Sequence, residues 1–241
     1  MKLFPIHKRP PPVKAWHVPV SKIKFADVID DTWDLTVKKV IPQIDGIKEV
    51  RRIARDADVA LDLTKAALQH LLYYDSIMMA DMFMFGNIYA PNPDMKDFIT
   101  NKDGMQEECA NYVYINGPRL PNFQLLRLFT SLATGRTLKE WLKLHMDQGF
   151  QVMEHVDVRR FIQFGLIKGL IYRIHKYAVS DQYLEMKAKG ENPAKDGDIL
   201  MKYLDGCHCF DQISVETNLG DAKIMEHLRK YPKGDIDIIY R

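Results

Sequence analysis

The sequence predicts a mainly helical protein with small β-wings, built as tandem winged helix-turn-helix-like units that are joined by helical segments. Two observations predict this class. Apolar residues recur three and four positions apart over much of the chain, which is the period of amphipathic helices. Short strand-like runs follow pairs of such helices, and helix, turn, helix, hairpin is the order of a winged helix.

Residues 1–30 are expected to form a proline-rich arm or linker, in which residues 14–20 could pair as an edge strand. Prolines prevent a regular helix in this arm, and they are Pro5, Pro10, Pro11, Pro12 and Pro19. The first winged-helix-like unit is expected over residues 31–95. Asp31 is expected to cap its first helix, which must end before Pro42.

Two more helices and a pair of strands complete this first unit. Apolar residues over 44–57 fall at helical spacing, and Asp62 is a suitable N-cap for the helix that follows. Residues 77–90 are rich in Met, Phe, Ile and Tyr. We expect them to form two strands that meet as a hairpin at Gly86 and Asn87.

Residues 96–180 are expected to form a helical region with a second winged-helix-like unit. A helix is expected over residues 97–114, with the Asn-Gly-Pro sequence at 116–118 as its end. A strongly apolar helix is expected over residues 123–132.

The next helix of this region should begin at a capping box formed by Thr137 and Glu140. Asp157 should cap a further helix that runs to about Leu170. Residues 171–179 then have the composition of a strand, so the second unit repeats the order of helices followed by a strand.

The last third of the chain is expected to contain a polar loop and a small unit. Residues 181–202 are rich in Gly, Asn, Asp and Lys, which is typical of a mobile loop. Residues 203–241 should then form a small helix-turn-helix with a strand. Its helices are expected over residues 209–217 and 221–230, and its strand over residues 236–240.

Composition excludes several classes of function. The chain has 241 residues, 46% of them hydrophobic, and a formal net charge of +2. A simple polyanion binder would have many more cations than acids. Three cysteines are too few for a disulfide framework, and no apolar run reaches the roughly 18 residues of a membrane helix. We therefore expect a cytoplasmic protein with reduced thiols.

Catalytic and cofactor motifs are not evident. The sequence contains no phosphate-binding glycine loop, no HExxH and no GxSxG, so we expect no cofactor and no enzyme activity. The consecutive residues Cys207, His208 and Cys209 are capable of binding metal. Structural zinc sites, however, use paired ligands separated by two to four residues. A thiol–imidazole pair is the other enzyme hypothesis, with Cys109 and one of His145, His155 and His175.

The alternative function is that of a winged-helix DNA-binding regulator. Its recognition helix would begin at Asp62, and would offer only Lys65, Gln69 and His70 to a duplex. Because each phosphate contact needs a cation, that helix predicts weak binding. Winged-helix units with such apolar helices are better suited to docking other proteins.

Aromatic side chains are the best candidates for a protein interface, because they dominate interface energies. The candidates are Tyr73, Tyr74, Phe83, Phe85 and Trp141. Each of them could instead belong to a core, since large aromatic side chains are often buried.

Eight short segments occur in the order and spacing of one known family. They are Trp33-Asp-Leu-Thr36, Pro42-Gln-Ile-Asp-Gly46, Ala57-Asp-Val59, Leu71-Leu-Tyr-Tyr74, Asn87-Ile-Tyr89, Gln163-Phe-Gly-Leu-Ile-Lys168, Tyr172-Arg-Ile-His-Lys-Tyr177 and Gly206-Cys-His-Cys-Phe-Asp-Gln-Ile213. From about Arg9 to Tyr240, the chain resembles the C-terminal part of nitrogen permease regulator 2-like proteins.

The resemblance implies a subunit of the GATOR complex, whose yeast counterpart is part of the SEA complex. The implied partners are a regulator 3-like subunit and a DEP-domain-containing subunit. The implied assembly activates GTP hydrolysis by Rag GTPases at the lysosomal or vacuolar surface, and it restrains TOR complex 1 when amino acids are scarce. Contact with nucleic acid is not implied, and contact with the membrane would be indirect.

The resemblance also implies that this chain lacks the family's N-terminal longin-type domain, whose loop carries the catalytic arginine. Such an arginine neutralises charge on the transferring phosphoryl group. The resemblance gives no arginine of this chain that role. Five arginines of the expected helices should instead lie on solvated helix faces, and they are Arg51, Arg52, Arg55, Arg159 and Arg160.

Overall fold

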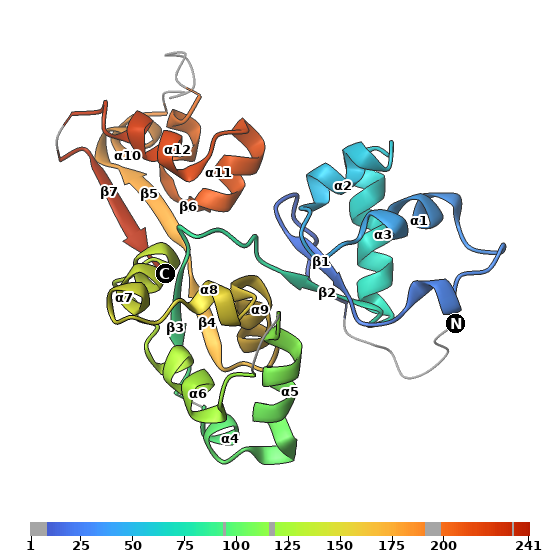
Figure 1. The fold of residues 1–241 in the computed structure, drawn as a ribbon. Coiled ribbons are helices and arrows are strands. Elements are labelled where there is room, and N and C mark those ends of the chain that lie inside the picture. The colour runs from blue at the N-terminus through green and yellow to red at the C-terminus, as the bar shows by residue number, and fades with distance from the viewer. Residues whose placement is uncertain (1–8, 94, 116–118, 191–198, 233) are drawn as a thin grey trace. The chain divides into compact units, whose positions relative to one another are not determined.

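A computed structural model of the chain describes residues 9–93, 95–115, 119–190, 199–232 and 234–241 (Figure 1). Helices outweigh strands in the described ranges, and the strands form small antiparallel sheets. The predicted class, mainly helical with small β elements, is confirmed. The chain forms two compact units, the first of Met1–Met82 with Asp211–Gly220 and the second of Phe83–Phe210 with Asp221–Arg241.

The first unit places three helices between two strands that pair with each other. Its elements are β1 (Val18–Ser21), α1 (Leu35–Val40), α2 (Val50–Asp56), α3 (Leu61–Tyr73) and β2 (Ile77–Ala80), with 3₁₀ turns at Phe25–Asp27 and Ile41–Gln43. Most of α11 (Phe210–Thr217) also belongs to this unit. The three helices confirm the sequence-based assignment, although α2 and α3 begin at other residues than expected.

The first cap of this unit differs from the prediction. Asp34, rather than Asp31, precedes α1, and its carboxylate accepts hydrogen bonds from the amides of Thr36 and Val37. Asp62 lies inside α3 instead of capping it, because Ala60 is the N-cap residue. Asp31 and Asp34 give equally good cap signals in the sequence, whereas the N-cap of α3 is an alanine that gives no such signal.

The expected arm contributes to the core of the first unit. Val13 and Phe25 are buried, and they pack in one cluster with Ile53 and Leu68, which are fully buried. Burying such side chains stabilises a fold by about 1.5–3 kcal/mol each. The described part of the arm is therefore held by packing.

The predicted hairpin at residues 77–90 is wrong, although both of its strands exist. β2 pairs with β1, so that Val18 lies opposite Ala80. β3 (Ile88–Pro91) pairs instead with β4 (Ile171–Ile174) of the second unit. In each case a strand before the helices pairs with a strand after them (Figure 1). A sequence-local turn signal cannot reveal such distant pairing.

The second unit contains two small sheets and most of the helices. Its elements are β3, α4 (Lys96–Ile99), α5 (Met105–Val113), α6 (Asn122–Thr130), α7 (Leu138–Asp147), α8 (Val152–His155), α9 (Val158–Ile167), β4, β5 (Lys176–Ser180), α10 (Asp181–Ala188), β6 (Asp205–Cys209), α12 (Asp221–Leu228) and β7 (Ile236–Tyr240), with 3₁₀ turns at Lys102–Gly104 and Met201–Tyr203. The capping box of Thr137 and Glu140 is present, and Asp157 caps α9 as predicted.

Three predicted elements of this unit need correction. The single helix expected over 97–114 is broken into α4 and α5, because Asn101, Asp103 and Gly104 have left-handed backbone angles. The strand expected over 171–179 is divided between β4 and β5, which belong to different sheets.

The polar loop expected over 181–202 begins with helix α10, whose N-cap is Ser180. Residues 116–118 and 191–198, where a helix end and a loop were expected, lie outside the described residues.

Aromatic rings form the centre of the second unit's core. Phe129 stacks on Phe161 with 4.0 Å between ring centroids, and Trp141 lies parallel to Phe161 at 6.1 Å. Phe98 meets Phe129 edge-on at 5.3 Å. This cluster joins α4, α6, α7 and α9, so it fixes the helices on which the candidate site depends.

Candidate interaction surface

The segment between β2 and β3 holds two of the predicted interface residues. Phe83 is half-buried against the core of the second unit, whereas Phe85 is 43% exposed. Their rings meet edge-on with centroids 5.4 Å apart. Phe85 therefore lies at the surface, in edge-on contact with the Phe83 ring.

Hydrogen bonds fix the backbone on both sides of Phe85. The amide of Lys139, at the start of α7, donates to the Phe85 carbonyl at 2.8 Å, and the amide of Leu138 donates to the Asn87 carbonyl at 2.8 Å. The Lys176 ammonium donates to the Gly86 carbonyl at 3.1 Å and lies 3.3 Å from Asp221 Oδ2. The exposed ring is thus presented by an ordered backbone.

A second aromatic group lies at the C-terminal end of α3 in the first unit. Tyr74 is 37% exposed, and Tyr73 is half-buried. The ring of Tyr74 meets His70 at 4.9 Å and Tyr73 at 5.4 Å, both edge-on. Each tyrosine combines an apolar ring with a polar hydroxyl, and this combination is suited to a protein interface.

Trp141 is removed from the interface candidates, because it is only 1% exposed. Its indole N–H donates to Ser131 Oγ at 2.7 Å, and Ser131 Oγ lies 2.9 Å from His145 Nε2. Ser131 Oγ also donates to the Leu128 carbonyl at 2.8 Å. Since that hydroxyl has a single proton, His145 donates through Nε2 and Trp141 is a hydrogen-bonded core residue.

Sequence reasoning missed several exposed apolar side chains. Phe123 is 73% exposed and Leu35 is 69% exposed, each near the start of a helix. Phe123 lies two residues before Leu125, which belongs to the buried stripe of α6, so the helical period places it on the opposite face. This two-residue offset from the buried stripe was the sequence signal that could have identified Phe123 as exposed.

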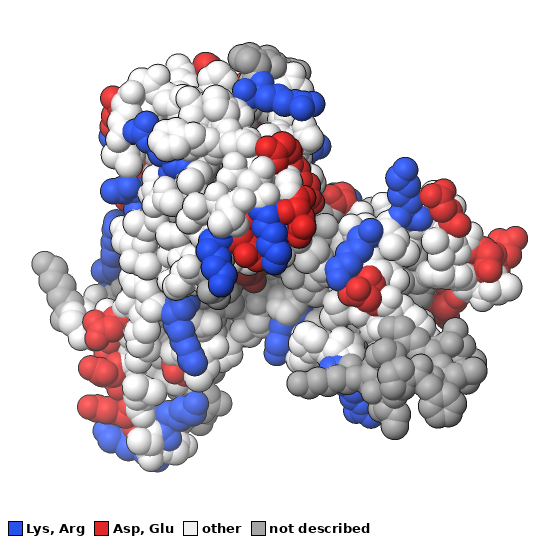
Figure 2. Space-filling view, turned by 90° about the horizontal axis from the view of Figure 1, so that it is seen from below, with Lys and Arg blue, Asp and Glu red and all other residues white. Residues whose placement is uncertain are grey.

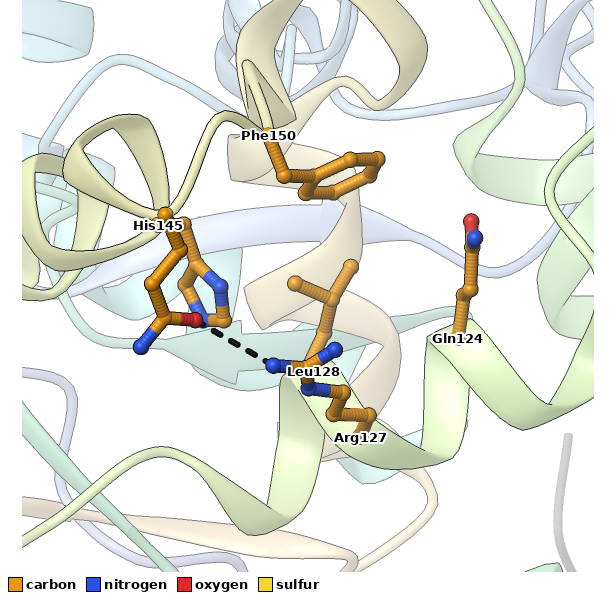
Figure 3. A pocket seen from close by; sticks show the side chains of 6 residues that line it. Gln124, Arg127, Leu128, His145 and Phe150 are labelled. Carbon is orange, nitrogen blue, oxygen red and sulfur yellow. Dashed lines mark hydrogen bonds between the residues drawn. The ribbon is translucent and has the colours of Figure 1, made fainter.

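A small pocket lies beside the buried histidine (Figure 3). It has a volume of about 90 Å³ and is lined by Gln124, Arg127, Leu128, His145, Gln148 and Phe150. Arg127 Nη2 donates to Gln148 Oε1 at 3.2 Å across its wall. Pockets for cofactors and drug-sized ligands occupy about 300–1,000 Å³, so this one is too small for them.

The thiol–imidazole hypothesis finds no support in the geometry. Cys109 is fully buried in α5, and burial, aided by Glu108, raises the pKa of its thiol to about 12. A thiol with that pKa is not a nucleophile at neutral pH. His145 already contacts Ser131, and His155 stacks on Phe150 at 5.3 Å.

Within the part of the chain that the structure describes, Cys207, His208 and Cys209 do not bring three ligand atoms together around one point. Cys207 is exposed while Cys209 is buried, and His208 Nδ1 lies 2.7 Å from Asp205 Oδ1. Burial alone would raise the pKa of Asp205, but hydrogen bonds from the Cys207 amide and from His208 lower it. The His208 side chain therefore interacts with the Asp205 carboxylate of the same strand.

The proposed recognition helix offers little to DNA. Lys65 lies 3.5 Å from Asp62 on the same helix, and His70 contacts Tyr74. On the face of the molecule in Figure 2, Lys and Arg are interspersed with Asp and Glu. This pattern differs from the basic stripe of a nucleic-acid-binding protein.

Three of the five candidate arginines have structural partners. Arg52 lies 3.9 Å from Asp56, and Arg160 lies 3.6 Å from Asp157. Arg51 departs from the expected solvated position, because its Nη1 donates to the Val215 carbonyl at 2.7 Å.

Within the described residues, the helices are too short or too polar to span a bilayer.

Comparison with known proteins places these features in a family. The family model described as nitrogen permease regulator 2 matches residues 1–122 and 118–232. The nitrogen permease regulator 2 homolog of Schizosaccharomyces pombe is 38% identical over 243 residues, which cover 100% of this chain and 57% of that protein.

Two further relatives agree with this match. The GATOR complex protein NPRL2 of Drosophila melanogaster is 31% identical over 92% of this chain and 50% of its own length. Nitrogen permease regulator 2 of Saccharomyces cerevisiae is 33% identical over 56% of this chain and 22% of its own length. The chain thus spans about half the length of the first two relatives.

Proposed function

The chain belongs to the nitrogen permease regulator 2 family, and on that premise we propose that it is the non-catalytic interaction part of a subunit of a GATOR-type complex. The name of the Drosophila relative supports the assignment to this complex. The chain would hold partner subunits by burying apolar surface between them. Stable interfaces of this kind bury about 1,200–2,000 Å².

The partners and the process are part of this proposal. The partners are a regulator 3-like subunit and a DEP-domain-containing subunit. The assembled complex would stimulate GTP hydrolysis by Rag GTPases at the lysosomal or vacuolar surface. It would restrain TOR complex 1 during amino-acid starvation.

Phe85 is the observation that carries the proposal. Its ring is 43% exposed, but the hydrogen bond from Lys139 holds its backbone in place. An aromatic side chain that is already ordered loses little conformational freedom on binding. More of the free energy of burying it therefore contributes to the affinity. Tyr74 supplies a similar amphipathic ring in the first unit.

The chain is proposed to be non-catalytic because no recognised motif assigns a catalytic role to its arginines, and three of the five candidates have structural partners. A GTPase-activating arginine must reach the transferring phosphoryl group. Arg51 instead binds a carbonyl, and Arg160 lies beside Asp157. The catalytic arginine would belong to another domain of the full-length subunit.

Co-expression with the regulator 3-like subunit tests the proposal. An affinity tag on this chain should capture the partner, and Phe85→Ser should reduce the amount captured. Phe123→Ser is the matched control, because it removes another exposed phenylalanine, and it should leave capture unchanged. Failure of the unmodified chain to capture the partner would contradict the proposal.

Single-turnover GTP hydrolysis by Rag proteins tests the non-catalytic part. The isolated chain should not change the rate, whereas the full complex should increase it. Acceleration by the isolated chain would show that one of its own arginines is catalytic.

A further inference from the structure

One of the two outer strands of the three-stranded sheet, β7, is regular and mostly apolar. The sheet has the order β6-β5-β7, so β7 is an edge strand, and its sequence is Ile-Asp-Ile-Ile-Tyr. Ile239 is 49% exposed and Tyr240 is 54% exposed. Natural edge strands usually carry features that discourage pairing with another chain.

The opposite edge of the same sheet has such a feature. Gly206 in β6 has a positive φ of 73°, and the register of β6 against β5 shifts between Tyr177 and Val179. This irregularity distorts the β6 edge. In contrast, β7 pairs with β5 without interruption from Ile236 to Tyr240, so its outer edge is straight.

Hydrogen bonds define which backbone groups of β7 point outward. Arg241 and His175 exchange two bonds, at 2.7 and 2.9 Å, and the Asp181 amide donates to the Asp235 carbonyl at 3.1 Å. In an antiparallel ladder, every second residue bonds to the neighbouring strand. Residues 235, 237, 239 and 241 therefore bond toward β5, and Ile236, Ile238 and Tyr240 direct their N–H and C=O groups outward.

This outward set is symmetric about Ile238. A second β7 strand placed antiparallel across a two-fold axis would pair Ile238 with itself and Ile236 with Tyr240. All three residues of each strand would then form hydrogen-bonded pairs. The same register places Asp235 of one copy opposite Arg241 of the other, and Asp237 opposite Ile239.

We propose that the β7 edge binds a second copy of this chain, through antiparallel β7–β7 pairing centred on Ile238. Charge supports this occupant, because the register places Arg241 of each copy opposite Asp235 of the other and keeps the two Asp237 residues apart. The Asp235 carboxylate also accepts from Ser180 Oγ at 3.1 Å and from the Gln182 amide at 3.0 Å within its own chain, so this ion pair adds only a modest contribution. A pair of five-residue strands is small compared with the roughly 1,200 Å² of stable interfaces. The dimer is therefore weak, and it forms at high local concentration.

Disulfide trapping tests the register. The background carries Cys207→Ser, because Cys207 is exposed while Cys109 and Cys209 are buried. Ile238→Cys should form a covalent dimer on mild oxidation, since its Cα atoms would lie within the span of a disulfide. Ile236→Cys is the matched control, and alone it should remain monomeric because it would face Tyr240.

The double variant Ile236→Cys/Tyr240→Cys should regain the covalent dimer. Equal cross-linking of all single-cysteine variants would indicate random collision and would overturn the proposal. A monomer for every variant would overturn it as well, including the case in which β7 pairs with a strand of another protein.

Sedimentation velocity over a concentration series tests association without cross-links. The unmodified chain should shift toward a dimer at high concentration, and Ile238→Pro should abolish the shift. The Ile238 amide points away from β5, so proline removes an outward donor and keeps the β5 ladder. Thermal unfolding should confirm that the variant is folded. A dimer that persists in this folded variant would contradict β7 pairing.

Discussion

Gly165 lies inside α9 in close contact with Phe129 and Ile171. A Cβ at this position would lie 2.8 Å from Phe129 and 2.9 Å from the side chain of Ile171. Alanine normally stabilises a helix by about 1 kcal/mol relative to glycine. Here the steric conflict with a ring of the aromatic core reverses the sign.

We expect Gly165→Ala to lower the free energy of unfolding by about 1–3 kcal/mol, as overpacking does in a dense core. Gly135→Ala is the control, because no heavy atom lies within 4 Å of its Cβ. Urea denaturation of both variants measures the difference. A Gly165→Ala variant as stable as the Gly135→Ala variant would show that the core can move aside.

His145 should make stability depend on pH. Burial is the main cause that lowers its pKa below the ordinary 6.5, and Arg127 and Arg136 lower it further. The unfolded chain therefore binds more protons than the folded chain just below pH 6.5, so stability rises with pH there. The contribution of His145 to the free energy of unfolding is fully present above the unfolded-state pKa of 6.5. It is lost as the pH falls from 6.5 through the lower pKa of the folded chain.

The measurement is the urea midpoint between about pH 5 and about pH 7.5, compared with that of His145→Gln. The variant should lose part of the slope, because glutamine does not titrate and can still donate to Ser131. An unchanged slope would assign the pH dependence to other groups.

At the scale of an element, the first cap of α1 gives a direct comparison between neighbouring carboxylates. Asp34 accepts two backbone amides, and the side-chain and backbone hydrogen bonds of Thr36 lower the pKa of Asp34. Asp31 makes an ion pair with Lys38 at 3.6 Å at the surface. Asp34→Ala should therefore lower the urea midpoint, whereas Asp31→Ala should change it little. The reverse order would mean that α1 begins earlier.

Local signals predicted most helices but could not predict strand partners. The capping box at Thr137 lies within four residues, so the sequence carries all of it. The pairing of Val18 with Ala80 depends on three intervening helices that bring two distant strands together. Gly86 and Asn87 resemble a hairpin turn, but the segment instead bonds to α7.

Local signals located the candidate surface only in part, for a related reason. Phe85 and Trp141 both read as aromatic anchors, and only the packing of α6, α7 and α9 decides which ring is buried. The exposed edge of β7 depends on the order of strands in its sheet. Composition cannot contain that order.

At the scale of the whole molecule, charge distinguishes a docking protein from a DNA-binding one. The net charge is +2, and cations such as Lys65, Lys168 and Lys176 lie beside carboxylates. An ion-paired lysine must give up its partner before it can neutralise a phosphate. Ion pairing of these lysines therefore reduces the number of phosphates that the protein can neutralise.

We expect no salt-sensitive binding to duplex DNA at micromolar protein, measured by fluorescence anisotropy at about 50 and 200 mM salt. A protein that contacts six to ten phosphates would lose about 10³–10⁵ in affinity across that range. Asp62→Lys is an informative comparison, because it removes the partner of Lys65 and adds a cation to α3. Measurable binding by this variant alone would show that losing this acidic partner and adding one cation to α3 are enough for binding, whereas steep salt dependence in the unmodified chain would favour the DNA-binding alternative.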